Sequence, residues 1–257
     1  MAETKKRPTI TNAAGYEEAK EAAQQGQSAI QGNATGLRVG AIVLWVLAFV
    51  FEVLAVLIVF GKLNISFMPT MWALIILIVL DLACVVIGSQ LWKKANHILP
   101  ASEKNRTLFW IWNNLGVIVA CFAFVPLIII MLSNKDLDKK TKVIATIAAI
   151  VALLIGGAAS VDYNPVSLEQ QQAAMSELGA TDVYWTPFGK VYHTHVDEEG
   201  DDYCPHLNRS EALTRGTVEQ AIAAGRTRLC SWCARHDEID TAGILMDDGT
   251  VEETDIS

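Results

Sequence analysis

The stretch Val39–Phe60 reads VGAIVLWVLAFVFEVLAVLIVF and contains a single charged residue, Glu52. A helix needs about 20 mainly apolar residues to cross a hydrocarbon layer about 30 Å thick. Only helices and closed barrels satisfy all their backbone polar groups in such a layer. This stretch therefore predicts a transmembrane helix.

Three further apolar stretches follow it. With the first span at residues 39–60, we expect the others at residues 70–92, 108–132 and 143–159. The last is the shortest, but its small residues Gly156, Gly157 and Ala158 would allow close packing between helices. The sequence predicts an all-α membrane protein in which residues 39–160 form a four-helix transmembrane bundle, followed by a small C-terminal α/β zinc-binding module.

The charges near the spans favour one orientation. Lys5, Lys6 and Arg7 add to the positive residues on the side that would hold both termini, and cytoplasmic loops carry the excess of Lys and Arg. Unpaired cysteines in the C-terminal region also fit a reducing compartment. We therefore expect a multi-pass protein of the cell membrane with both termini in the cytoplasm.

The two ends of the chain are polar. Residues 1–38 lack a continuous apolar stripe, so we expect a partly disordered segment with at most a frayed helix at residues 16–31. The net charge of -8 is concentrated at residues 237–257, where eight acidic residues and no Lys or Arg occur. Residues 237–257 are therefore expected to be an acidic, disordered, solvated tail, not an acidic binding face.

The residues between the last span and this tail have turn and cap signals. Residues 161–181 should be a linker with a short helix, and residues 182–236 a folded module. The expected elements are a helix at residues 167–178, strands at 183–186 and 190–193 joined by Pro187-Phe188-Gly189, and a helix at 218–224.

Three cysteines and several histidines lie in this module. Cys230 and Cys233 form a C-x-x-C pair, while His193 and Cys204 follow the expected hairpin. An odd number of cysteines beside histidines fits a metal site better than a disulfide framework. Zinc prefers four tetrahedral ligands drawn from thiolate and imidazole, so the expected site has three cysteines and one histidine.

The module resembles the small bacterial zinc-binding cassettes of the Ada type. The matching residues are Thr186, Pro187, Gly189, Tyr192, His193, Cys204, Leu207, Ala221, Gly225, Cys230 and Cys233. The resemblance covers about residues 182–235 and implies a structural zinc held by His193, Cys204, Cys230 and Cys233.

The chain departs from the cassette pattern in one place. An acidic insertion at residues 197–202 lengthens the gap before Cys204, so His195 and His206 are alternatives to His193. The resemblance also raises DNA binding, but the insertion and the acidic tail oppose a phosphate-binding surface. We expect no nucleic-acid partner.

The polar residues of most interest within the expected spans are Glu52, Asp81, Asn113 and Asn114. Antiparallel spans would place both carboxyl groups near the middle of the bilayer, where charge is costly. They indicate either a proton or cation pathway or protonated carboxyl groups hydrogen-bonded within the bundle. The asparagines could form hydrogen bonds between helices.

Different classes of function remain open. The first is a non-enzymatic membrane anchor for a structural-zinc module that binds a protein partner. The alternative is a proton, cation or small-solute conductor, which formation of a homo-oligomer would favour. A thiol- or zinc-dependent sensor or enzyme is third, because the chain has no nucleotide-binding loop, H-E-x-x-H helix or serine elbow.

Overall fold

The computed structural model describes residues 8–29, 32–63, 66–196 and 203–248. They form two compact units. The helical bundle comprises Asn33–Ala95 and Trp110–Tyr163. The sheet unit comprises the described parts of Met1–Gly32, Asn96–Phe109 and Asn164–Ser257.

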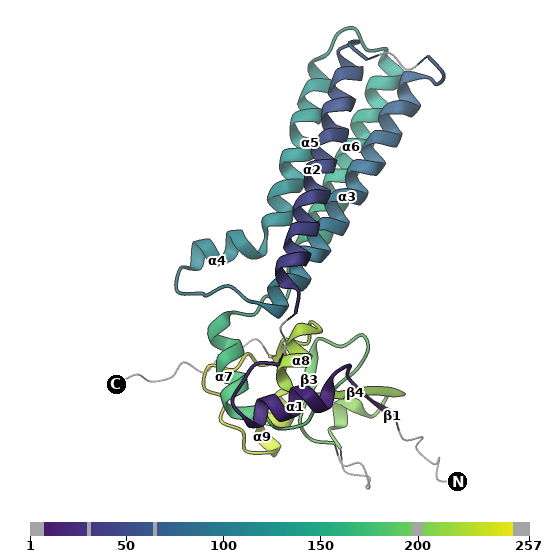
Figure 1. The fold of residues 1–257 in the computed structure, drawn as a ribbon. Coiled ribbons are helices and arrows are strands. Elements are labelled where there is room, and N and C mark those ends of the chain that lie inside the picture. Colours follow the sequence, from purple (N-terminus) through teal and green to yellow (C-terminus); the bar gives the residue numbers. More distant parts are fainter. Residues whose placement is uncertain (1–7, 30–31, 64–65, 197–202, 249–257) are drawn as a thin grey trace, which may run out of the picture. The chain divides into compact units, whose positions relative to one another are not determined.

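The bundle is built from α2 (Ala34–Val59), α3 (Thr70–Ile98), α5 (Leu115–Ser133) and α6 (Lys139–Ser160), which lie side by side (Figure 1). All four are long and apolar enough to cross a membrane, by length and composition. The predicted number of long apolar helices is therefore confirmed among the described residues. The fourth is longer than the predicted residues 143–159, because Asp138 caps it through the amides of Lys140 and Thr141.

The third span is not continuous, which corrects the expected helix at residues 108–132. A short helix, α4 (Arg106–Asn113), ends just before Asn114, and α5 begins at Leu115. The Asn114 side-chain amide donates to the Trp110 carbonyl over 3.0 Å. Such local side-chain bonds compete with regular helix geometry, and α5 alone, at about 1.5 Å per residue, still spans nearly 30 Å.

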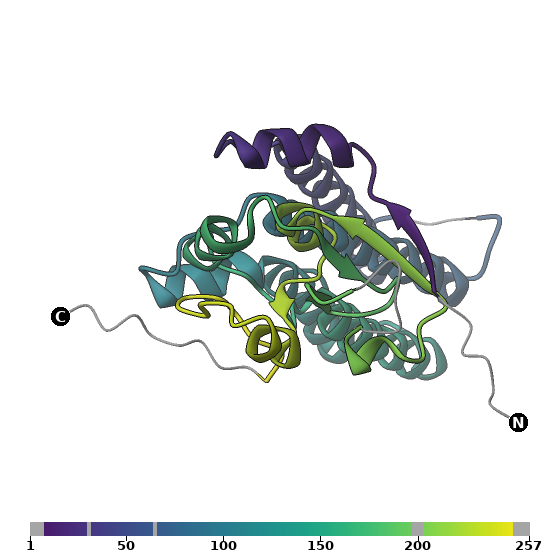
Figure 2. The same cartoon turned by 90° about the horizontal axis from the view of Figure 1, so that it is seen from below.

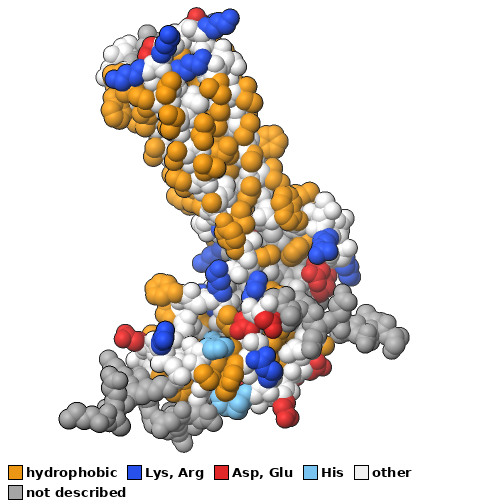
Figure 3. Space-filling view, turned by 180° about the vertical axis from the view of Figure 1, so that it is seen from behind, with side chains coloured by type: hydrophobic (Ala, Val, Ile, Leu, Met, Phe, Trp, Pro, Cys, Tyr) orange, Lys and Arg blue, Asp and Glu red, His pale blue; other side chains and the backbone are white. Residues whose placement is uncertain are grey.

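Alanines of α2 face the interior of the bundle, while many large apolar side chains face outward. Ala41, Ala48 and Ala55, spaced by seven residues on α2, are all at most 1% exposed, whereas Phe49 is 62% exposed. Figure 3 shows apolar side chains covering the bundle along its length, with Lys and Arg gathered at one end. An exposed apolar surface of this extent suits lipid, not water.

The sheet unit has a five-stranded sheet in the order β1-β4-β2-β3-β5. Its strands are β1 (Thr9–Asn12), β2 (Val183–Trp185), β3 (Val191–His193), β4 (Ala212–Gly216) and β5 (Arg228–Leu229). The β2–β3 hairpin confirms the two predicted strands. β4 pairs antiparallel with β2, while the pairs β1–β4 and β3–β5 are parallel.

Helices pack around this sheet. They are α1 (Tyr16–Gln24), α7 (Leu168–Leu178), the 3₁₀ turn η1 (Pro205–Leu207), α8 (Val218–Ala223) and α9 (Ser231–His236). Both predicted capping boxes are present, Ser167 with Gln170 and Thr217 with Gln220. A core that includes Trp185, Tyr192 and Ile222 lies between sheet and helices.

The N-terminal segment is part of the sheet unit, which corrects the expectation of a polar, partly disordered stretch at residues 1–38. β1 runs beside β4 at the sheet edge (Figure 2), with Thr9 paired to Ala212 and Asn12 to Arg215. The polar sequence of β1 is compatible with this position because Thr9, Thr11 and Asn12 are exposed and Ile10 is partly buried.

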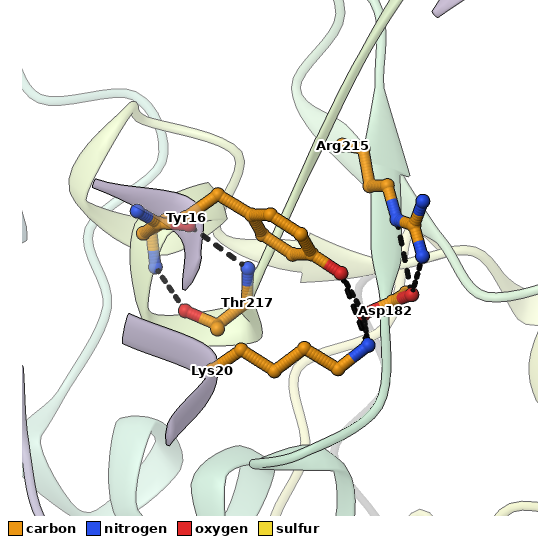
Figure 4. A network of polar contacts seen from close by, with 6 residues as sticks. Tyr16, Lys20, Asp182, Arg215 and Thr217 are labelled. Atoms are coloured by element: carbon orange, nitrogen blue, oxygen red, sulfur yellow. Dashed lines mark hydrogen bonds and ion pairs between the residues drawn. The ribbon is translucent and has the colours of Figure 1, made fainter. Parts of the chain in front are cut away.

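A polar network holds α1 to the sheet (Figure 4). Asp182 accepts hydrogen bonds from Tyr16 over 2.7 Å and from Lys20 over 2.8 Å. Arg215 on β4 donates to the other carboxylate oxygen through Nε over 3.0 Å and also through Nη2. Burial alone would raise the pKa of Asp182, but the hydrogen bonds from Lys20, Tyr16 and Arg215 outweigh it and lower the pKa.

The acidic tail begins later than Asp237. Ile244 and Met246 are buried in the core of the sheet unit, and the Leu229 amide donates to the Leu245 carbonyl over 2.8 Å. Apolar residues within this acidic stretch therefore add to the sheet unit, which the prediction for residues 237–257 missed. The last residues of that range, 249–257, and the acidic insertion at 197–202 lie outside the described residues.

Three separate chain segments make the sheet unit. One precedes α2, one joins α3 to α4, and one follows α6. The connecting segment is held by the Leu168 amide, which donates to Ala101, and by Ser102, which bonds Glu169. Two candidate spans separate each of these segments from the next, α2 and α3 first and then α5 and α6.

Candidate metal centre

Four buried side chains converge at one end of β3. They are His193, Cys204, Cys230 and Cys233, whose ligand atoms all lie within 4.8 Å of one another. The three cysteines are completely buried, and His193 is 5% exposed. The structure thus brings together the four residues expected from the sequence, and this cluster can hold a metal ion.

Short backbone connections position these side chains. His193 ends β3, Cys204 precedes η1, and Cys230 precedes α9, so that Cys233 lies in its first turn. The Cys230 amide donates to Tyr192 over 3.0 Å, and the Cys204 amide donates to His195 over 3.0 Å. Both cysteine-bearing turns are therefore hydrogen-bonded to the same strand and its extension.

The spacing of the ligand atoms fits a tetrahedral site. Bonds of about 2.3 Å from zinc to sulfur place two thiolates about 3.8 Å apart, and the Cys204 and Cys230 sulfurs are 3.8 Å apart. With zinc–nitrogen bonds of about 2.0 Å, sulfur and nitrogen would lie about 3.5 Å apart. The Cys233 sulfur lies 3.7 Å from His193 Nδ1. A disulfide needs about 2.05 Å, and all three cysteines are free.

Hydrogen bonds among the thiols shift their pKa values in opposite directions. Hydrogen bonds from Cys204 and then from Cys233 lower the pKa of Cys230 far below its usual range. The bond to Cys230 raises the pKa of Cys204 in turn. A divalent cation would bind all three groups as thiolates and release the remaining protons.

The two alternative histidines lie elsewhere. His206 is exposed, and its Nδ1 is 3.3 Å from the Cys230 sulfur. Its ligand atom lies within 4.8 Å of those of Cys230 and Asp247, so this set contains one thiol. His195 belongs to a different cluster, with His236 and Asp237. Among the described histidines, only His193 has a ring nitrogen within 4.8 Å of all three thiol sulfurs in one such set.

The cluster of His195, His236 and Asp237 has no signal in the sequence. His195 lies 42 positions before Asp237, and no short motif connects it to the other two residues. His195 and His236 each place Nδ1 3.0 Å from Asp237 Oδ1. Only the packing of α9 against the end of β3 brings them together.

The intramembrane polar residues lie inside the bundle. Glu52 on α2 is 5% exposed and Asp81 on α3 is 1% exposed. Neither oxygen of Asp81 has a hydrogen-bond partner among the described residues. Asn113 and Asn114 are also buried, but Asn114 bonds within its own turn, to Trp110, not to another helix.

No protein-family model, curated protein or solved structure matches this chain.

Proposed function

We propose that this chain is a non-enzymatic, multi-pass membrane protein whose helices anchor a zinc-stabilised domain that presents a binding surface to a partner in the cytoplasm. The observation that carries the proposal is the buried set of His193, Cys204, Cys230 and Cys233 at tetrahedral spacing. A complete set of four protein ligands leaves no open position for a substrate.

The position of the site supports a structural role. Cys204, Cys230 and Cys233 pack with Leu207 and Leu213 in a small apolar cluster. β3 has three residues and β5 has two, so little regular structure stabilises this end of the sheet. A metal joining β3, η1 and α9 would supply the missing stability, as it does in other small domains.

The metal content of the full chain, purified in detergent and washed with a chelator, tests this proposal. We expect one tightly held zinc per chain. Cys204→Ala should lose this zinc. Cys121→Ala should keep it, because Cys121 is an exposed residue of α5 and does not belong to the ligand set. Wild-type protein without retained zinc, or equal zinc in both variants, would contradict the proposal.

Asp81 supports a second candidate function, conduction of protons or cations. A carboxyl group with no hydrogen-bond partner among the described residues is expensive inside a bilayer, and a simple anchor would not need it. Glu52, also buried in the bundle, would be the second group of the pathway.

Flux through vesicles containing the purified chain separates the two candidates. If the bundle conducts, Asp81→Asn and Glu52→Gln should abolish proton or cation flux while the tightly held zinc stays bound. Retained zinc shows that the sheet unit is folded in each variant. Equal flux in the wild type, the variants and empty vesicles would remove conduction and leave the anchor.

A further inference from the structure

A second cluster of potential ligands lies at the surface of the sheet unit. His195 follows β3, His236 is the last residue of α9, and Asp237 caps that helix. Both imidazoles direct Nδ1 at the same oxygen, Asp237 Oδ1, each over 3.0 Å. The side chains of His195, His236 and Asp237 are 20%, 43% and 24% exposed.

Neighbouring side chains hold these groups in place. The Thr194 hydroxyl donates to Asp237 Oδ2, which leaves Oδ1 directed at the histidines. The Trp232 ring stacks on His236, with centroids 4.6 Å apart, and lies edge-on to His195 at 5.5 Å. Such outer contacts orient metal ligands and fix their rotamers.

The spacing matches that of ligands around one cation. Ligand atoms about 2.1 Å from a metal at angles of 90–110° lie about 3.0–3.4 Å from one another. The two nitrogen–oxygen distances of 3.0 Å fall in this range. Two imidazoles and one carboxylate suit divalent transition metals and leave coordination positions open.

We propose that His195, His236 and Asp237 form a second metal site that binds an exchangeable divalent transition-metal ion. The site differs from the thiolate cluster in three respects. Among the described residues it has no sulfur ligand and three protein ligands instead of four, and it is reached by solvent. The bound ion therefore exchanges rapidly and accepts water or an external ligand.

Both sites use the same two elements. His193 of the first site ends β3, and His195 of the second site follows two residues later. In α9, Cys233 of the first site lies near the start and His236 of the second site is the last residue. An ion at the second site would therefore stabilise the same junction of β3 with α9 from the solvent side.

The test is a Zn²⁺ titration of the full chain in detergent, in competition with a zinc indicator. A prior chelator wash removes exchangeable metal, and the retained zinc is measured separately. The wild type should bind one further Zn²⁺. His236→Ala and Asp237→Asn should bind this ion at least tenfold more weakly while keeping the retained zinc, which reports that they are folded. His97→Ala is the control and should match the wild type.

The possible results separate the two sites. If the wild type takes up no further ion, or if His236→Ala takes it up as tightly as the wild type, the second site does not exist. A wild type without retained zinc refutes the thiolate site, yet a loss of uptake confined to His236→Ala and Asp237→Asn still supports the second site.

Discussion

His193 and His206 both lie near the thiols, but their surroundings differ. His193 is 5% exposed and contacts Cys233, while the exposed His206 contacts Cys230. We expect His193→Ala to abolish tight zinc binding. His206→Ala should keep one zinc per chain but lower its affinity about 10–100-fold, as loss of an outer hydrogen bond to a ligand does. Competition with a chelator measures both effects.

If His206→Ala lost tight zinc binding and His193→Ala kept it, His206 and not His193 would complete the site. If both variants kept the metal unchanged, the ligand set would be wrong.

Local spacing explains which site residues could be predicted. Cys230 and Cys233 are separated by two residues at the start of a helix, and such a pair can be recognised from the sequence alone. His236 and Asp237 follow directly after them, but their partner His195 is brought in only by folding. A site formed by distant residues has no comparable signal.

At the scale of the elements, α1 depends on Asp182 for its attachment to the sheet. The pKa of Asp182 is lowered from its ordinary 3.8. A carboxylate with a lowered pKa in the folded state stabilises that state above the unfolded-state pKa, and the contribution is lost as the pH falls through the folded-state pKa. The attachment should therefore be full at pH 7 and weaken below about pH 4.

Hydrogen exchange of the α1 amides measures this attachment. Asp182→Asn should speed their exchange about tenfold at pH 7, as expected for loss of charge-assisted hydrogen bonds. The difference from the wild type should shrink at about pH 3. Glu21→Gln, at an exposed position of the same helix, should have no effect. Equal exchange in the wild type and Asp182→Asn at pH 7 would contradict this role.

Two glycines of the bundle offer a matched test of its packing. A Cβ atom at Gly116 on α5 would lie 2.7 Å from Ser89 Cβ and 3.1 Å from Ser160 Cβ, whereas one at Gly157 would meet nothing within 4 Å. Gly116→Ala should destabilise the bundle by about 1–3 kcal/mol. Gly157→Ala should be neutral or stabilise it by up to about 1 kcal/mol, since alanine favours helices.

Thermal unfolding in detergent compares the two variants. A lower midpoint only for Gly116→Ala is the expected result. Equal midpoints would mean that α5 does not pack closely against Ser89 of α3 and Ser160 of α6 at Gly116.

The elements differed in how far they could be predicted. The helices begun by Ser167 and Thr217 were correct because capping boxes are local. β1 was missed because Thr-Ile-Thr-Asn has no apolar alternation and is a strand only through pairing with β4, 200 residues away. The break at Asn114 was missed because hydropathy alone does not register a side-chain bond to the backbone.

At the scale of the whole molecule, the composite sheet unit determines a topology. Its N-terminal, connecting and C-terminal segments belong to one folded unit, so we expect all three on the same side of the membrane. The loop between α2 and α3 follows a single candidate span, so we expect it on the other side.

Cysteine labelling in intact cells tests this topology and its direction. Phe67, between α2 and α3, is 83% exposed, and Phe188, in the β2–β3 turn, is 97% exposed. In a chain carrying Cys121→Ala, an impermeant maleimide should label Phe67→Cys in intact cells and Phe188→Cys only after lysis. The opposite pattern would place the sheet unit outside the cytoplasm, and labelling of both would contradict the four-span topology.

Zinc-edge X-ray absorption of the full chain, after a chelator wash, tests the central claim most directly. A site made by Cys204, Cys230, Cys233 and His193 predicts three sulfur neighbours at about 2.3 Å and one nitrogen neighbour at about 2.0 Å. A first shell without sulfur, or one with a water oxygen in place of the fourth protein ligand, would contradict the closed structural site.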